Sequence, residues 1–265
     1  MSPDLIVLPL LPLSEFESRA KFSHWTELLH TVVIGPGLGR DLDILKDFGF
    51  LLENISDKIC VCDADFFWFY SQSSNSNKQI LRRFQNVIFT PNFVEFTRLF
   101  KNVMGKEFNS ETVDNFLESN EESSMDVIEF DLASHLPAVK EFYDSFENSG
   151  LCFVIKYKND IIVTNNRCYL VKTQGSLKRC GGLGDILTGL IANFSQRAVA
   201  TSIDMEYALL FASVVNRKAC HEAYKKYQLG LVASDVLKYV PRIVNTYLEE
   251  NSHEKIFEDV KTVDN

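Results

Sequence analysis

The sequence predicts an α/β fold, with a mostly parallel central sheet and helices on both of its faces. Short apolar runs such as TVVIG (31–35) and LCFVIKY (151–157) alternate with longer segments of helical periodicity. The apolar runs are continuous rather than alternating, which is typical of strands buried on both sides. Ligands of such sheets bind beyond the carboxyl ends of the strands, so the loops at that edge are expected to form one site.

Three of these strands are predicted by the sequence of the first half of the chain. They are expected at 31–35, 58–65 and 86–90, and they end at the turns GPGLG, DAD and TPN. An amphipathic helix is expected from Asp41 to about Asn54, between the first and second strands.

The segment after Pro91 has the pattern of a capped helix. The apolar residues of NFVEFTRLFKNVM have helical spacing. Asn92 is the expected N-cap, and Glu95, three residues later, is its capping-box partner.

The second half of the chain predicts one further strand, a hairpin and several helices. The polar stretch 106–125 is expected to be the least structured part, and a helix at 132–148 leads to the strand 151–157. DIIVTNN and RCYLVKT form the expected hairpin around the turn NNR. Three helices are expected at the end, at 185–195, 205–224 and 234–249.

The composition argues against a nucleic-acid surface. The 265 residues carry a formal net charge of −9, whereas such a surface needs clustered Lys and Arg. The acidity is concentrated in 118–131 and in the tail 249–265, and we interpret both as solvated surface. One domain over residues 1–265 is expected, with an acidic tail from about residue 250.

The cysteines and histidines predict no metal site. Cys60 and Cys62 form C-x-C within an apolar run, so on a strand both face the same side as reduced core thiols. There is no C-x-x-C pair or Cys/His ligand spacing, and the five histidines show no mutual spacing, so zinc is not expected. The aromatic run FFWFY (66–70) is expected in the core and at a partner surface rather than as a platform for stacking bases.

The chain also shows no sign of a membrane span or a signal peptide. No apolar run reaches the ~18 residues of a span. The first residues lack a basic region and a small-residue cleavage site. A cytoplasmic protein is expected, with a mitochondrial pool only from a longer form, and with neither nucleic acid nor membrane as a partner.

The stretch GSLKRCGGLGDILTGLIANF (175–194) is the strongest sign of chemistry. Glycines let backbone N–H groups close on a ligand, and the N-terminus of the following helix offers unpaired donors. With Lys178 and Arg179 in the loop, we expect an anion site, most often for phosphate. Asp185 is either a first-turn carboxylate favoured by the helix dipole or a general base for a hydroxyl nucleophile.

Four motifs carry a resemblance to a known family. In order, VVIGPGLGRD, CDAD, VIFTPNFVEFTRLF and GSLKRCGGLGDILTG resemble the motifs of the ATP-dependent NAD(P)H-hydrate dehydratases, which belong to the ribokinase-like superfamily. The resemblance implies a three-layer ribokinase-like sandwich. It also implies the repair of hydrated NADH or NADPH: ATP phosphorylates the ring hydroxyl, and loss of phosphate restores the double bond.

The resemblance also assigns residues to the two ligands. Asp185 would take the hydroxyl proton and contact the substrate. The implied ATP-binding residues are Lys156, Tyr157, Lys158, Asn159, Asp160, Gly175, Ser176, Leu177, Lys178, Arg179, Cys180, Gly181, Gly182, Leu183 and Gly184. The implied substrate-binding residues are Gly39, Asn92, Phe93, Val94, Glu95, Phe96, Thr97, Arg98 and Asp185. Asn92-x-x-Glu95 resembles the superfamily's element for magnesium and phosphate, with Glu95 acting on Mg²⁺ through water; the alternative is the capping box.

The chain departs from the family pattern in places. Family members usually begin with another glycine-rich strand–turn–helix segment, which is expected to be absent here. Tyr157 and Phe66 stand where glycine is usual, and Leu183 stands where glutamine is common. Two alternatives therefore remain: a kinase of the same superfamily for a small alcohol, such as a vitamin or sugar, and a non-catalytic nucleotide-binding relative. The sequence leaves a homo-oligomer open.

Overall fold

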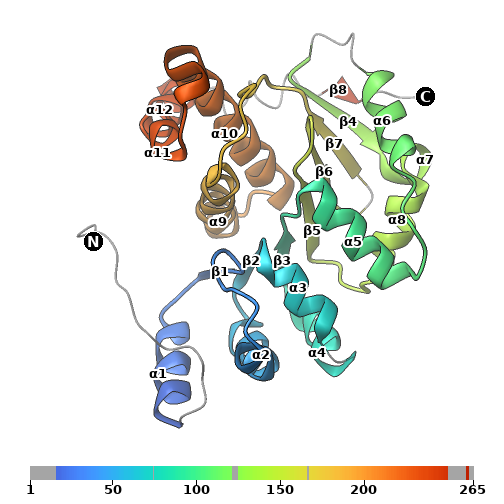
Figure 1. Cartoon of the computed structure of the whole chain (residues 1–265), viewed down its shortest axis with the longest axis vertical. Coiled ribbons are helices and arrows are strands. Elements are labelled where there is room, and N and C mark those ends of the chain that lie inside the picture. The colour runs from blue at the N-terminus through green and yellow to red at the C-terminus, as the bar shows by residue number, and fades with distance from the viewer. Residues whose placement is uncertain (1–15, 74, 121–124, 166, 250–260, 263–265) are drawn as a thin grey trace.

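A computed structural model describes residues 16–73, 75–120, 125–165, 167–249 and 261–262. Figure 1 shows a central sheet with helices on both sides. The expected acidic tail lies outside the described residues except for 261–262. Among the helices of the described ranges, none is long and apolar enough to cross a membrane.

Within the described residues, the sheet has eight strands in the order β1-β2-β3-β5-β6-β7-β4-β8. Its strands are β1 (Thr31–Ile34), β2 (Ile59–Cys62), β3 (Asn86–Phe89), β4 (Val127–Asp131), β5 (Leu151–Ile155), β6 (Asp160–Val163), β7 (Arg167–Val171) and β8 (Lys261–Thr262). The strands at one end, β1, β2, β3 and β5, run parallel. The pairs β5–β6, β6–β7 and β7–β4 are antiparallel. The sheet is therefore mixed, and the prediction of a mostly parallel sheet was wrong.

Strand β4 was not predicted, because it lies in the acidic stretch that we interpreted as solvated surface. Val127 and Ile128 are only 2% and 1% exposed, and they lie in the clusters on opposite faces of the sheet. Glu129 forms an ion pair with Arg167 of β7, with 3.4 Å between carboxylate and guanidinium. The acidic residues that flank residues 127–131 led us to interpret this stretch as solvated surface. That interpretation was wrong, because the stretch forms a buried strand.

Twelve α-helices are described in the ranges given above. They are α1 (Phe16–Glu27), α2 (Leu42–Ile55), α3 (Asp65–Gln72), α4 (Asn75–Ile80), α5 (Phe93–Met104), α6 (Ser110–Glu118), α7 (Leu132–His135), α8 (Pro137–Asp144), α9 (Leu183–Thr201), α10 (Met205–Tyr227), α11 (Ala233–Leu237) and α12 (Val240–Glu249). The 3₁₀ turns η1 (Leu81–Arg83) and η2 (Gln228–Gly230) follow α4 and α10.

Three helix predictions need correction. The stretch expected to be least structured contains α6, which buries Val113, Phe116 and Leu117. The single helices expected at 132–148 and 234–249 are each two helices. Each second helix has proline in its first two positions, Pro137 in α8 and Pro241 in α12. Proline disfavours helical geometry in the residue before it, and Leu136, before Pro137, is non-helical with φ −132° and ψ 62°. Val240, before Pro241, is by contrast the first residue of α12.

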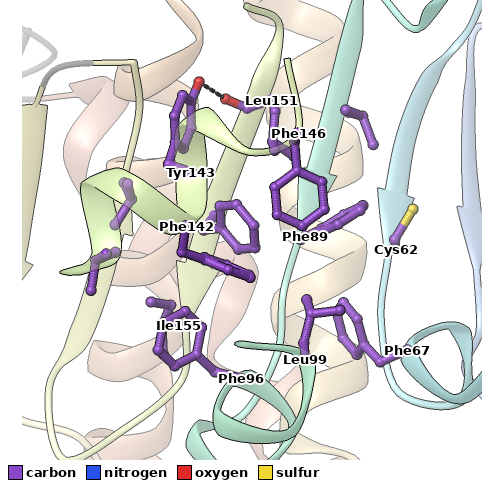
Figure 2. Close-up of a cluster of buried hydrophobic side chains, with 14 of the residues drawn as sticks. Cys62, Phe67, Phe89, Phe96, Leu99, Phe142, Tyr143, Phe146, Leu151 and Ile155 are labelled. Carbon is purple, nitrogen blue, oxygen red and sulfur yellow. Dashed lines mark hydrogen bonds between the residues drawn. The ribbon is translucent and has the colours of Figure 1, made fainter. Parts of the chain in front are cut away.

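The core forms on both faces of the sheet. Helices α9 and α10 cover one face, where Leu187 and Leu209 pack against strand residues. Helices α2, α3, α5, α6 and α8 contribute to the other cluster, which is rich in phenylalanine. Figure 2 shows part of it, where Phe146 packs against both Phe89 and Phe142. Tyr143 donates a 2.6 Å hydrogen bond to the carbonyl of Leu151. The helices on both faces are as predicted.

Two smaller predictions about this core are also confirmed. Cys60 and Cys62 are buried on the same side of β2, with their sulfur atoms 3.6 Å apart. Residues 66–70 lie in α3, where Phe66 and Phe69 are fully buried.

Candidate functional site

An open cleft of about 870 Å³ lies beyond the carboxyl ends of the parallel strands, beside the start of α9. It is lined by Asn92, Phe93, Val94, Glu95, Arg98, Lys156, Tyr157, Lys158, Asp160, Gly175, Ser176, Leu177, Lys178, Arg179, Cys180, Leu183, Gly184, Leu187, Asn216, Arg217 and Cys220. The cleft brings together parts of all three segments that the sequence singled out: 92–98, 156–160 and 175–184. The edge of the sheet at which it forms is the expected one.

The first two of these segments are joined through their backbones. The amide of Phe93 donates to the carbonyl of Lys156 over 3.0 Å, and the amide of Lys156 donates to the carbonyl of Pro91 over 2.8 Å. These bonds continue the parallel pairing of β3 and β5 past the ends of the strands. The predicted substrate segment and the predicted ATP segment are therefore held side by side.

The glycine loop ends in a left-handed turn that starts α9. Gly182 is the N-cap residue, with φ +89°, and no side chain caps the helix there. A Cβ on Gly182 would lie 2.9 Å from the Cβ of Ala233, so the position requires glycine for both its conformation and its contact. The first N–H groups of α9 are therefore not satisfied by a capping side chain, which suits an anion.

The two basic residues of the loop differ in their contacts. The Lys178 ammonium donates to the carbonyls of Leu229 and Leu231, the second over 2.9 Å. These bonds use two of its three protons and tie the loop to the segment after α10. Arg179 is exposed and lines the cleft. Lys178 thus fixes the loop with most of its donor capacity.

A buried network lies under the loop and involves two residues that the sequence analysis did not select. The Lys156 ammonium donates to one oxygen of Asp63 over 2.6 Å, and the Thr188 hydroxyl lies 2.9 Å from the other. Asp63, directly after β2, is 2% exposed. Its carbonyl oxygen would lie 1.7 Å from a Cβ on Gly35, so the start of the GPGLG turn packs directly on it. The signals for Asp63 in the sequence were its position after a strand and its place in the motif CDAD.

Tyr157, which stands where the family usually has glycine, is directed toward α5 and α6. Its ring stacks on Phe93 with centroids 4.1 Å apart, and its hydroxyl donates to Asp114 of α6 over 3.0 Å. Burial and this bond raise the pKa of Tyr157. Lys158 also donates to Asp114, and this bond and the tyrosine bond lower the pKa of Asp114. One aromatic stack therefore forms part of the cleft wall.

Arg217 of α10 contacts the predicted ATP segment, 156–160, and was also not selected from the sequence. Its guanidinium donates to the carbonyls of Thr173 and Lys158, over 2.5 and 2.8 Å, and to the carboxylate of Asp160 over 3.2 Å. Asp160 is 5% exposed and also accepts a bond from Ser213. Asp160 therefore has a structural role in this network, beside whatever it contributes to a ligand.

Glu95 forms the predicted capping box. Its carboxylate accepts from the Asn92 amide over 2.9 Å, and the Asn92 side chain accepts from the Glu95 amide over 2.9 Å. Burial raises the pKa of Glu95, although the bond from Asn92 and the nearby charge of Lys156 oppose the shift. The capping box uses one carboxylate oxygen, so the second remains for a hydrated cation. Groups of three or more His, Cys, Asp or Glu side chains suited to a metal are not found among the described residues.

Several predicted site residues do not line the cleft. Asp185 is exposed in the first turn of α9. The Gly39 amide donates to Asp65 over 3.1 Å, beside the Arg40–Asp65 ion pair. The Phe96 ring is fully buried and packs on Phe142, so it does not reach the cleft. The remaining residues outside the lining are Thr97, Asn159, Gly181 and Gly182.

The fold and the cleft define a class: α/β proteins with a glycine loop at a helix start facing the ends of parallel strands. Solved structures with this fold include a protein of Streptococcus mutans described as hypothetical, with a TM-score of 0.63 and 16% identity over 86% of this chain and 70% of that one. A ribokinase-like superfamily protein of Enterococcus faecalis has a TM-score of 0.62 and 17% identity over 88% of this chain and 68% of that one. These similarities establish a ribokinase-like fold.

The sequence comparisons establish the family. A model of the NAD(P)H-hydrate dehydratase family matches residues 1–242. The ATP-dependent (S)-NAD(P)H-hydrate dehydratase of Drosophila melanogaster is 32% identical over 94% of this chain and 72% of its own length. The rat enzyme is 28% identical over 90% of this chain, which spans 64% of the rat protein. The chain belongs to the NAD(P)H-hydrate dehydratase family.

Proposed function

We propose that this chain carries out the ATP-dependent dehydration of hydrated NADH or NADPH. The observation that supports this most is the meeting of the glycine loop, the ATP segment and the substrate segment in one cleft, in a chain of this family. The relatives named above supply the reaction and its ATP dependence.

The glycine loop is assigned to the phosphates of ATP. The backbone N–H groups of Gly182 to Gly184 lie at the uncapped start of α9 and hold the group that is transferred. The segment Lys156 to Asp160 lines the nucleotide side, and Arg217 holds it against the end of β7. The protein contribution is thus chiefly positioning and the neutralisation of charge, as in phosphoryl transfer generally.

Asp185 is assigned as the general base. Its carboxylate takes the proton of the ring hydroxyl, the hydroxyl oxygen forms a bond to the terminal phosphorus of ATP, and ADP leaves. In the second step the bond between the ring carbon and the phosphate oxygen breaks, phosphate leaves, and a proton is lost from the neighbouring ring carbon. The carbon–carbon double bond is then restored, and the water of hydration has been removed as phosphate.

Magnesium is part of this proposal. A Mg²⁺ ion typically keeps several waters and binds one or two protein carboxylates together with substrate phosphates, so the single carboxylate of Glu95 fits it. When bound with ATP, the ion would neutralise charge on the phosphates. Glu95 holds the start of α5 and would reach the ion through water.

The test is a turnover assay with hydrated NADPH, ATP and magnesium, followed as the return of reduced-nicotinamide absorbance. Turnover that needs ATP supports the proposal. In parallel, a hundredfold excess of ATP over its Kd should stabilise the fold by roughly 2.7 kcal/mol in thermal unfolding. A chain that is stabilised by ATP but never turns over is a non-catalytic nucleotide-binding relative, and a chain that ATP does not stabilise refutes the assignment of the loop.

A further inference from the structure

We propose that Asp63 is a positioning residue that holds the Lys156 ammonium at the first turn of α9, where Lys156 meets the terminal phosphoryl group of ATP. The inference rests on the proposed function, because it names the cation of that site and the residue that fixes it. It assigns a role to Asp63 and Thr188, neither of which lines the cleft.

The position of Lys156 supports this assignment. Its ammonium is 2.6 Å from Asp63 and 3.4 Å from the point at which a Cβ on Gly184 would stand. The side chain is 19% exposed and lines the cleft. Asp63 accepts one of the three ammonium protons, and the other two remain for an anion at the start of the helix. An anion at the start of α9 would therefore meet both the helix N-terminus and the Lys156 ammonium.

The environment of Asp63 explains why it can position another group. Its side chain is 3% exposed, and both carboxylate oxygens have partners on different elements: Lys156 after β5, and Thr188 within α9. A carboxylate held from two sides has little freedom to move. Because the ends of β2 and β5 and the first turns of α9 meet at Asp63, it fixes the distance between the ammonium and the glycine loop.

Lys178, the lysine of the glycine loop, is less suited to this role. Lys178 donates to two backbone carbonyls beyond α10, Leu229 and Leu231. An anion would have to compete with these bonds for its ammonium. Lys178 thus holds the loop itself, while the ammonium assigned to the phosphoryl group comes from Lys156 at the end of β5.

The experiment compares the affinities of the full chain for ATP and for ADP by calorimetry, with magnesium in excess. Lys156→Met should weaken ATP by about tenfold to a hundredfold, since a hydrogen bond to a charged group is lost, and should weaken ADP much less. Asp63→Asn should act in the same direction by about tenfold. The double variant should be no weaker than Lys156→Met alone, because Asp63 acts only through Lys156.

Matched controls separate this from a general loss of charge or stability. Lys106→Met and Glu141→Gln break a surface ion pair of 2.9 Å outside the cleft, and they should leave both affinities unchanged. If Asp63→Asn does not fold, Thr188→Val removes the bond to the other carboxylate oxygen and should lower the ATP-to-ADP affinity ratio as well. Thermal unfolding of each variant checks that the compared proteins are folded.

Four results would overturn the inference: an equal loss of ATP and ADP affinity in Asp63→Asn, additive losses in the double variant, a ratio that changes in Lys178→Met and not in Lys156→Met, or no ATP binding by the wild type. If the wild type binds ATP but dehydrates nothing, the proposed function fails, whereas the affinity ratios still decide the role of Asp63.

Discussion

Replacing Asp185 by asparagine distinguishes its two candidate roles. A general base predicts lost turnover with intact stability, whereas a helix-stabilising residue predicts lost stability with intact turnover. Asp185 is exposed in the first turn of α9, and no hydrogen bond or ion pair joins its side chain to another described residue. Its contribution to folding is therefore limited to its interaction with the helix dipole, about 0.3–1 kcal/mol at low ionic strength. As a general base it would contribute ~10²–10⁴ in rate. The Asp185→Asn variant should stay within about 1 kcal/mol of the wild type in stability and lose at least about a hundredfold in turnover.

The assay pairs turnover of hydrated NADPH with the free energy of unfolding from urea titration. Asp204→Asn is the matched control, since Asp204 is an exposed acid that precedes α10, forms no side-chain cap there and lies outside the cleft lining. That control should change neither quantity. If Asp185→Asn turns over within a few-fold of the wild type, or unfolds, then Asp185 is a helix-stabilising residue and the proposed mechanism is wrong.

The remaining predictions concern the loop, one carboxyl and the thiols. Gly182→Ala forces a Cβ to within 2.9 Å of Ala233 at φ +89°, so urea titration should show a loss of about 1–3 kcal/mol; an unchanged stability would contradict the turn geometry. Glu95 has a raised pKa in the folded state, so the stability it contributes is present at low pH and is lost as the pH rises through that pKa. Glu95→Gln, which can keep the capping box, should therefore gain stability relative to the wild type between pH 4 and pH 7, and a constant difference would refute this. Cys60 and Cys62 should resist a thiol reagent in the native protein and react after denaturation, whereas fast native labelling of both would contradict their burial.

The strands of the first half could be predicted because each is a short apolar run with a clear stop. TVVI, ICVC and NVIF become parallel neighbours, in the order in which they occur. The antiparallel half was harder, because β4 is only the five residues VIEFD among acids. The buried residues of β4 follow the period of a strand, but the many acidic residues around this short pattern led us to interpret the stretch as surface. Helix α6 was missed for a similar reason: its apolar residues Val113, Phe116 and Leu117 have helical spacing within a polar stretch.

Part of the site could also be predicted, namely the residues that follow strands or precede a helix. The segments at 92–98, 156–160 and 175–184 contribute to one cleft as the topology required. Asp63 also follows a strand, but its partner Lys156 is 93 positions away in the chain. Thr188 and Arg217 could not be found in this way, since they act through partners 125 and 44 positions away. Periodicity and motif spacing carry no information about such pairs. Only the packing of α9 and α10 on the sheet brings them into contact.

The placement of the predicted residues sets Asp185 apart from most of the site. Most residues assigned to ATP line the cleft, and so do five residues assigned to the substrate, Asn92, Phe93, Val94, Glu95 and Arg98. Gly39 and Asp185, also assigned to the substrate, lie outside its lining. If the proposed function holds, a substrate hydroxyl that reaches both Asp185 and the phosphoryl group would approach the exposed first turn of α9 from the solvent side. The cleft would then hold ATP and part of the substrate, and Asp185 would act from outside the cleft lining. Loss of turnover with intact ATP affinity in Asp185→Asn is the result that this division of the site demands.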